Sequence, residues 1–374
     1  MPTDDLSRFC CQNPDCDSYG QRGGDNLLVI DHFGKARHRL LYCRACKARF
    51  SEFKGTPLFN SKLPHDKVLA ILEHLAEGCG VRQPRGWSGS PRRRPHGWPC
   101  SPVSTPRPPT TSWWPFPPET REVQFDEKWA FVYKKQRNCD PTNPDDDHCG
   151  DYWDHVAFDP EHKLVLAVVP GARTEENARA VVAEVAERVS CDPPPMMTSD
   201  EYPAYATAIE ETFSVPVPAP TRRKPGRPRV VPERRLPEDV IYATVHKHRE
   251  NGRVIAVEQR QVFGSPEALE DALGESAASH RVNTSFVERQ NGTDRGRNAR
   301  KARKTYRFSK DWQVHEAMTY LTLYSYNFCW RVRTLRRKDE RGRWQERSPA
   351  LAAGLTDHVW TWPEWFNRPA VQSA

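Results

Sequence analysis

Hydrophobic periodicity divides the chain into two structured regions, separated by a stretch that has neither the strand nor the helix period. Residues 27–42 contain two strand-like runs on either side of Gly34, which predicts a hairpin. Residues 63–77 carry apolar side chains at helical spacing, with Pro64 near the start and Gly78 directly after the end. A helix in this position is typical of the first helix of a helix-turn-helix, whose second helix enters the DNA major groove.

Both periods are lost between residues 82 and 118. Eleven of these 37 residues are proline, four are tryptophan, six are arginine and none is acidic. Proline removes backbone donors and blocks helix interiors, so this composition predicts a disordered or polyproline-like linker. The segment stands where a recognition helix is expected. An alternative explanation is therefore a slip of the reading frame near Gln83 that ends near Glu119.

A regular α/β pattern returns at residue 121. Three strands, a helix and a fourth strand are predicted in that order, at residues 123–133, 152–159, 163–171, 174–189 and 196–200. Thr174 is a good N-cap for the helix. This order indicates a mixed sheet with flanking helices in a domain over residues 121–330.

Further elements follow the fourth strand. A basic insert at about residues 212–264 contains a hairpin that turns at Asn251-Gly252, a sequence that favours a two-residue turn. Residues 311–330 predict a long helix with Tyr320, Tyr324 and Phe328 on one stripe, which we interpret as core. The last residues, 331–374, are predicted to be a basic tail.

Composition narrows the class of protein. The chain has 374 residues, enough for two or three domains, and a net charge of +7 with its Lys and Arg residues clustered, which favours a nucleic-acid partner. No run approaches eighteen apolar residues, so no membrane span is predicted. The N-terminus lacks a signal-peptide pattern, and we expect a cytoplasmic protein whose 11 cysteines are reduced.

Two close pairs of cysteines flank the predicted N-terminal hairpin, Cys11 with Cys16 and Cys43 with Cys46. A hairpin between them brings the pairs together, and four thiolates form a closed, structural Zn²⁺ site. The adjacent Cys10 is an alternative first ligand, and four buried free thiols are the alternative to a metal site. The sequence thus predicts a zinc ribbon at residues 1–55, followed by the helical remnant of a helix-turn-helix at residues 56–81.

Three acids are the candidate catalytic residues. Asp126 and Asp200 lie in the first and fourth predicted strands, and Glu288 lies in a predicted helix within a strongly basic block, residues 282–310. Carboxylate oxygens are the ligands that Mg²⁺ or Mn²⁺ prefers. Two such ions activate the attacking oxygen and stabilise the leaving oxygen of a phosphoryl transfer. The three acids therefore predict a two-metal site in which Asp126 bridges the ions.

The motifs FDEKWAFV, TSDEYPAY and FVERQNGTDR, together with the cysteine ribbon, resemble those of DDE transposases of the insertion-sequence-one type. The resemblance implies a ribonuclease-H-like catalytic fold and Mg²⁺-dependent cleavage of DNA, followed by strand transfer from the freed 3′-hydroxyl. It also implies catalysis by Asp126, Asp200 and Glu288, double-stranded DNA as partner, action as a homo-oligomer on DNA and a location at the prokaryotic nucleoid.

Basic side chains in three places are predicted to contact DNA. Arg295 lies seven residues after Glu288 and shares its helix face, and residues 222–235 resemble an AT-hook. The full set of candidate DNA contacts is Arg289, Arg295, Arg297, Lys224, Arg227, Arg229, Arg37 and Arg39. We interpret His315 as a satisfied histidine. The alternatives to a transposase are a non-catalytic zinc-ribbon DNA-binding protein or inactive remnant, and a nuclease acting on RNA.

Overall fold

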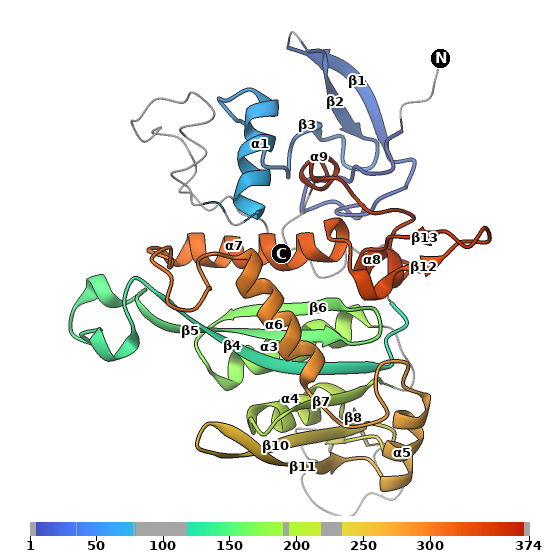
Figure 1. Cartoon of the computed structure of the whole chain (residues 1–374). Helices are drawn as coiled ribbons and strands as arrows, with labels where there is room; N and C mark the ends of the chain where they lie inside the picture. Colours follow the sequence, from blue (N-terminus) through green and yellow to red (C-terminus); the bar gives the residue numbers. More distant parts are fainter. Residues whose placement is uncertain are drawn as a thin grey trace, which may run out of the picture. The chain divides into compact units, whose positions relative to one another are not determined.

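The computed structural model describes residues 5–34, 36–77, 79, 118–189, 194–217 and 234–369 (Figure 1). They form two compact units. The first unit takes its described residues from 1–116, 131–151 and 292–374, and the second unit from 117–130 and 152–291. These boundaries differ from the predicted domains, because the C-terminal segment groups with the N-terminal ribbon. The predicted linker at 82–118 lies outside the described residues except for Pro118, as does the expected recognition helix.

The first unit begins with a three-stranded antiparallel sheet. Its strands, in the order β1-β2-β3, are Leu27–Phe33, His38–Cys43 and Arg49–Ser51. Gly34 has a φ of 71°, a conformation that glycine adopts without strain and that the turn after β1 requires. The predicted hairpin is therefore confirmed. Its small core is formed by Phe9, Leu27, Leu41, Phe50 and the neighbouring cysteines.

The predicted helix after the ribbon is α1, His65–Ala76. Ile71, Leu72, Leu75 and Ala76 are buried, whereas the expected stripe residues Val68 and Leu69 are half-buried. The buried apolar side chains of α1 therefore lie in the C-terminal half of the helix.

The C-terminal part of the first unit is folded rather than a tail. It contains α7 (Trp312–Cys329), the short helices η3 (Arg333–Leu335), α8 (Pro349–Ala352) and α9 (Trp362–Phe366), and the paired strands β12 (Arg337–Lys338) and β13 (Trp344–Gln345). The aromatic stripe of α7 is buried, as predicted. The Phe328 ring stacks on Trp360 at a centroid distance of 4.4 Å, so the terminal tryptophans extend the same core. The loop at 133–149 adds η1 (Gln136–Asn138) and η2 (Pro144–Asp146).

The second unit is built on a six-stranded mixed sheet in the order β11-β10-β7-β4-β5-β6. The strands are β4 (Glu122–Val132), β5 (Gly150–Asp159), β6 (Leu164–Gly171), β7 (Met196–Asp200), β10 (Tyr242–Glu250) and β11 (Arg253–Phe263). The last two residues of β4 and the first two of β5 fall in the first unit. β4, β7 and β10 are parallel, whereas β5 pairs antiparallel with β6 and β10 with β11. The predicted mixed α/β sheet is therefore confirmed.

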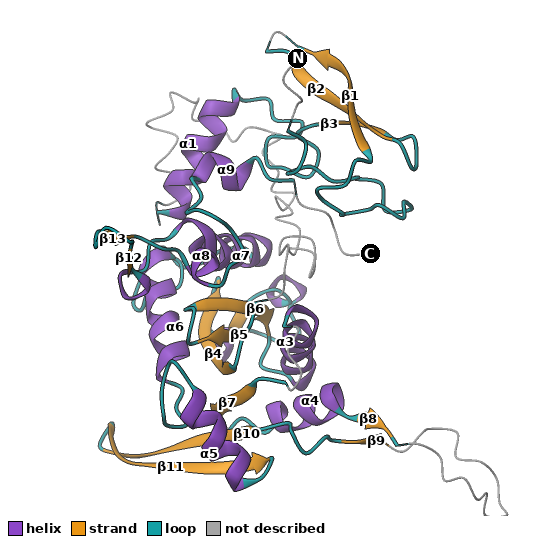
Figure 2. Ribbon diagram, turned by 90° about the vertical axis from the view of Figure 1, so that its right-hand side faces the viewer, coloured by secondary structure: helices purple, strands orange, loops and turns teal. Residues whose placement is uncertain are grey.

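Helices cover both faces of this sheet, with α3 and α6 on opposite sides in Figure 2. They are α3 (Glu175–Arg188), α4 (Ala204–Phe213), α5 (Pro266–Glu275) and α6 (Ser285–Arg297). The last six residues of α6, 292–297, fall in the first unit. Two short strands, β8 (Val215–Pro216) and β9 (Arg234–Arg235), pair beside them. Thr174 caps α3 by accepting a hydrogen bond from the Asn177 amide at 3.4 Å, as predicted. No described helix has the length and hydrophobicity needed to cross a bilayer.

Candidate functional site

Four cysteine side chains converge in the first unit. The sulfur atoms of Cys11, Cys16, Cys43 and Cys46 all lie within 4.8 Å of one another. Cys11 Sγ is 3.6 Å from Cys46 Sγ, and Cys16 Sγ is 3.9 Å from Cys43 Sγ. This is the ligand set of a closed tetrahedral site, so the four cysteines could hold a metal ion such as zinc.

The thiols of the cluster differ in acidity. A hydrogen bond from the Ala48 amide lowers the pKa of Cys46 to about 6, whereas burial raises the pKa of Cys11 and of Cys16. A metal ion bound by all four would have to displace the protons of the less acidic thiols. The choice between Cys10 and Cys11 is also decided. Cys10 is buried outside the cluster, where its sulfur accepts a hydrogen bond from Gln12 Nε2 at 3.2 Å.

The three predicted acids all lie in the second unit. Asp126 is in β4 and Asp200 ends β7, and these strands are adjacent and parallel. The pairing of the two strands runs as far as Gln124 with Thr198, and each aspartate follows two residues later on its own strand. Glu288 lies in the first turn of α6.

These carboxylates influence one another electrostatically. Desolvation raises the pKa of Asp126, and the negative charges of Asp200 and Glu288 raise it further. Desolvation also raises the pKa of Asp200, and Glu127 adds to that rise. The second unit therefore holds a concentration of negative charge that favours a bound cation.

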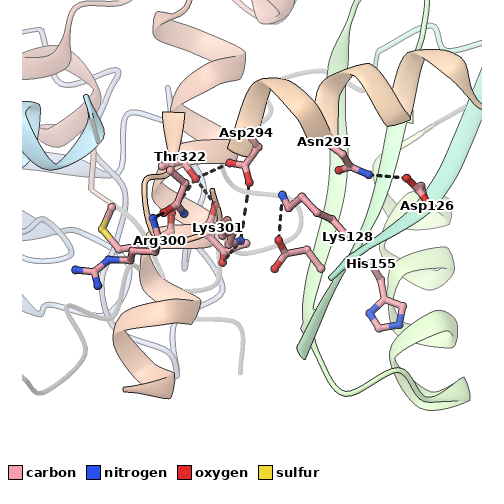
Figure 3. A network of polar contacts seen from close by, with 12 residues as sticks. Asp126, Lys128, His155, Asn291, Asp294, Arg300, Lys301 and Thr322 are labelled. Atoms are coloured by element: carbon pink, nitrogen blue, oxygen red, sulfur yellow. Dashed lines mark hydrogen bonds and ion pairs between the residues drawn. The ribbon is translucent and has the colours of Figure 1, made fainter. Parts of the chain in front are cut away.

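Two of the acids differ in how their oxygens are satisfied. Asp126 Oδ2 accepts a hydrogen bond from Asn291 Nδ2 at 2.7 Å (Figure 3). Its Oδ1 accepts a hydrogen bond from the Glu127 amide at 2.9 Å. Asp200 Oδ1 is buried without a hydrogen-bond partner. A buried carboxylate oxygen in this state is unfavourable unless a ligand or ion reaches it.

Glu288 is held by two side chains from different elements. Its Oε1 accepts a hydrogen bond from Thr284 Oγ1 at 2.8 Å and forms an ion pair with Lys247, which lies in β10. Sequence reasoning missed both Lys247 and Asn291. The position of Asn291 one helical turn after Glu288 was a usable signal, but nothing local connects Lys247 to an acid 41 residues away.

The three carboxylates are less tightly assembled than the cysteines. Among the described residues, only the cysteine set brings three or more metal-ligating side chains within 4.8 Å of one another. A site for two ions about 3.5–4 Å apart does not require such closeness, because the outer ligands bind different ions. The all-oxygen donor set and the unpartnered Asp200 oxygen fit a hard divalent cation.

Seven of the eight predicted DNA contacts fall into three groups, and Arg297 stands apart from them. Arg37 and Arg289 are exposed, and Arg295 is half-buried. Arg39 forms an ion pair with Glu52 at 2.8 Å, which fixes it within the ribbon. Lys224, Arg227 and Arg229 lie outside the described residues.

Arg297 has a packing role instead of a surface position. It is buried, its Nη1 donates a hydrogen bond to the Thr322 carbonyl at 2.8 Å, and its guanidinium lies 4.7 Å from the centre of the Trp330 ring. A guanidinium used in this way is not presented to a phosphate. We therefore leave Arg297 out of the proposed DNA contacts.

Other polar groups of the first unit form buried structural networks. Asp294, the second acid of the basic block, accepts a hydrogen bond from Thr322 Oγ1 at 2.9 Å and lies 4.0 Å from the Lys301 ammonium (Figure 3). His315 is buried and its Nδ1 lies 2.9 Å from Ser309 Oγ, so the predicted core position is confirmed and one of its two ring nitrogens has a hydrogen-bond partner. The second unit has its own buried pair, Lys128 with Asp154 at 3.0 Å.

No protein-family model matches the chain, and neither does any curated protein or solved structure. The site must therefore be interpreted from its own residues.

Proposed function

We propose that this chain is a DNA-cleaving and strand-transferring enzyme of the DDE transposase type. One observation carries the proposal: Asp126 and Asp200 lie on neighbouring parallel strands, where burial first and then the charges of Asp200 and Glu288 raise the pKa of Asp126. Acids from two strands and one helix thus share one electrostatic environment. The strand order and the mixed sheet support a ribonuclease-H-like fold for the second unit.

Asp126, Asp200 and Glu288 would hold the divalent ions. Bound Mg²⁺ or Mn²⁺ would supply Lewis-acid stabilisation of the attacking and leaving oxygens in an in-line phosphoryl transfer. The protein orients the carboxylates for this task. Asn291 fixes Asp126, and Thr284 fixes Glu288.

Double-stranded DNA is the proposed substrate. A phosphodiester at the element end would be hydrolysed, and the freed 3′-hydroxyl would then attack target DNA. Arg289 and Arg295 both follow Glu288 on α6 and would position the phosphate backbone. A structural Zn²⁺ on Cys11, Cys16, Cys43 and Cys46, assembly as a homo-oligomer on DNA and a cytoplasmic, nucleoid-associated location complete the proposal.

Substitution of the three acids tests the reaction. Asp126→Asn, Asp200→Asn and Glu288→Gln should each lower Mg²⁺-dependent nicking of supercoiled plasmid by about 100-fold or more, because charge stabilisation of the transition state is lost. Binding to DNA in a gel-shift assay should change little, since none of the three is a cation. The exposed Asp145→Asn, in η2, is the matched control and should cut at the wild-type rate.

Wild-type nicking by any one of the three variants would remove that residue from the proposed ligand set. The alternative is a non-catalytic zinc-ribbon protein that binds DNA. The Lys247–Glu288 ion pair favours this alternative, because Lys247 already compensates the charge of one acid. This alternative predicts DNA binding by the wild-type protein with no Mg²⁺-dependent cleavage at all.

A further inference from the structure

Lys247 makes a specific contact with one member of the acid set. Its ammonium pairs with Glu288 Oε1 and donates a second hydrogen bond to Thr284 Oγ1 at 3.1 Å. Thr284 Oγ1 in turn donates to the same Glu288 oxygen at 2.8 Å. The three groups form a closed set of contacts around a single carboxylate oxygen.

The sheet delivers Lys247 to this position. Val245 of β10 pairs with Asp200 at the end of β7, and Lys247 follows two residues later on the same strand. The positive charge of Lys247 also opposes the rise in the pKa of Asp200. One lysine therefore acts on two of the three acids, although it directly contacts only Glu288.

An ammonium and a divalent ion compete for such an oxygen. A divalent ion of this class binds a carboxylate oxygen at about 2.0–2.1 Å, and its charge repels an ammonium in contact with the same oxygen. The Lys247 side chain is 25% exposed and that of Glu288 is 47% exposed. Pairs this exposed are weak, so a divalent ion can displace the lysine.

We propose that Lys247 is the internal counter-cation of Glu288: it holds the carboxylate in the metal-free protein, and a divalent ion displaces it on binding. Lys247 is then a positioning residue that sets the metal affinity of the site. The inference rests on the proposed function, because it takes Glu288 as a metal ligand. The displaced ammonium can pair with a DNA phosphate, so DNA and the metal should strengthen each other's binding.

Metal affinity tests the inference without requiring catalysis. Mn²⁺ binding is measured by isothermal titration calorimetry on the full chain, with the cysteine site first loaded with Zn²⁺. Lys247→Met should bind Mn²⁺ about two- to fivefold more tightly than wild type, because the competing cation is gone. Lys247→Arg should restore near wild-type affinity. Arg249→Met removes the same charge from an exposed position of the same strand and is the matched control.

A second readout is the effect of DNA on Mn²⁺ affinity. A short duplex should raise the affinity of the wild-type protein more than that of Lys247→Met, because only the wild type has a lysine for the phosphate to remove from Glu288. Lys247→Gln serves as a second neutral variant if circular dichroism shows that Lys247→Met does not fold.

The outcomes separate the two proposals. In one outcome, Asp126→Asn abolishes Mn²⁺ binding but no Lys247 variant strengthens it. This result would overturn the role of Lys247 and leave the proposed function intact. The same holds if Arg249→Met strengthens binding as much as Lys247→Met. Absence of any Mn²⁺ binding dependent on Asp126 would overturn the proposed function, and the role of Lys247 with it.

Discussion

The two units solve the problem of gathering metal-ligating side chains in different ways. In the first unit, four sulfur atoms lie within 4.8 Å of one another, and three of the four cysteines are buried. In the second unit, three carboxylates come from β4, β7 and α6, and their oxygens contact an amide, a hydroxyl and an ammonium.

This difference agrees with the roles that we propose for the two sites. The thiol cluster could supply all four ligands of a structural metal, which takes its ligands from the protein alone. Asp126 and Glu288 make polar contacts that a cation could replace, and Glu288 remains half-exposed. A compact site thus indicates a stabilising role, whereas an open site held by exchangeable contacts suits binding and reaction.

The largest expected effect comes from breaking the compact site. Cys43→Ser should remove the bound metal and unfold the ribbon, because the metal supplies most of the stability of so small a core. Metal content by mass spectrometry and amide hydrogen exchange of β1 and β2 measure the loss. Cys10→Ser is the matched control and should retain the metal, since Cys10 lies outside the cluster.

Equal metal content in the Cys43→Ser and wild-type proteins would show that the four thiols are not a metal site. Loss of metal in Cys10→Ser would instead restore Cys10 as a ligand.

A smaller effect distinguishes two arginines of α6. Arg297→Ala should destabilise the first unit by about 2–3 kcal/mol, because it leaves the Thr322 carbonyl without its charged donor and removes the contact with Trp330. Arg289→Ala, at an exposed position, should leave stability nearly unchanged. It should instead weaken DNA binding and reduce its salt dependence by about one counterion. Urea denaturation and salt-dependent DNA titrations measure the two properties.

The reverse pattern, with a stable Arg297→Ala protein that binds DNA poorly, would return Arg297 to the DNA-contact set.

The smallest effect concerns the stability of the second unit. Asp126→Asn should raise its melting temperature in metal-free buffer by about 2–4 °C, the shift that about 1 kcal/mol produces in a domain of this size. The substitution removes a charge that desolvation, Asp200 and Glu288 all disfavour. The Asn291 side-chain amide can rotate so that its Oδ1, which has no hydrogen-bond partner, accepts a hydrogen bond from the NH₂ group that the substitution introduces.

Added Mg²⁺ should then raise the melting temperature of the wild type and have little effect on Asp126→Asn, because only the wild type binds the ion at Asp126. Equal stabilisation of both proteins by Mg²⁺ would show that Asp126 is not a ligand. Differential scanning fluorimetry across a Mg²⁺ series measures both changes.

The sequence by itself determined the local features of this protein. Gly34 and Asn251-Gly252 mark turns whose residues have positive φ, and Thr174 caps the helix that it was predicted to cap. The paired cysteines flank a hairpin, so their convergence depends on few residues. Each of these features depends on neighbours in the chain, and so local sequence carries the information.

Only the tertiary structure decided which distant groups meet. Lys247 reaches Glu288 because β10 lies beside β7, and Asn291 reaches Asp126 because α6 covers the face of β4. Arg297 looked like its neighbour Arg289, yet packing buried one and exposed the other. Such pairings are set by sheet order and helix packing, which no short segment specifies, because they result from burying many apolar side chains at once.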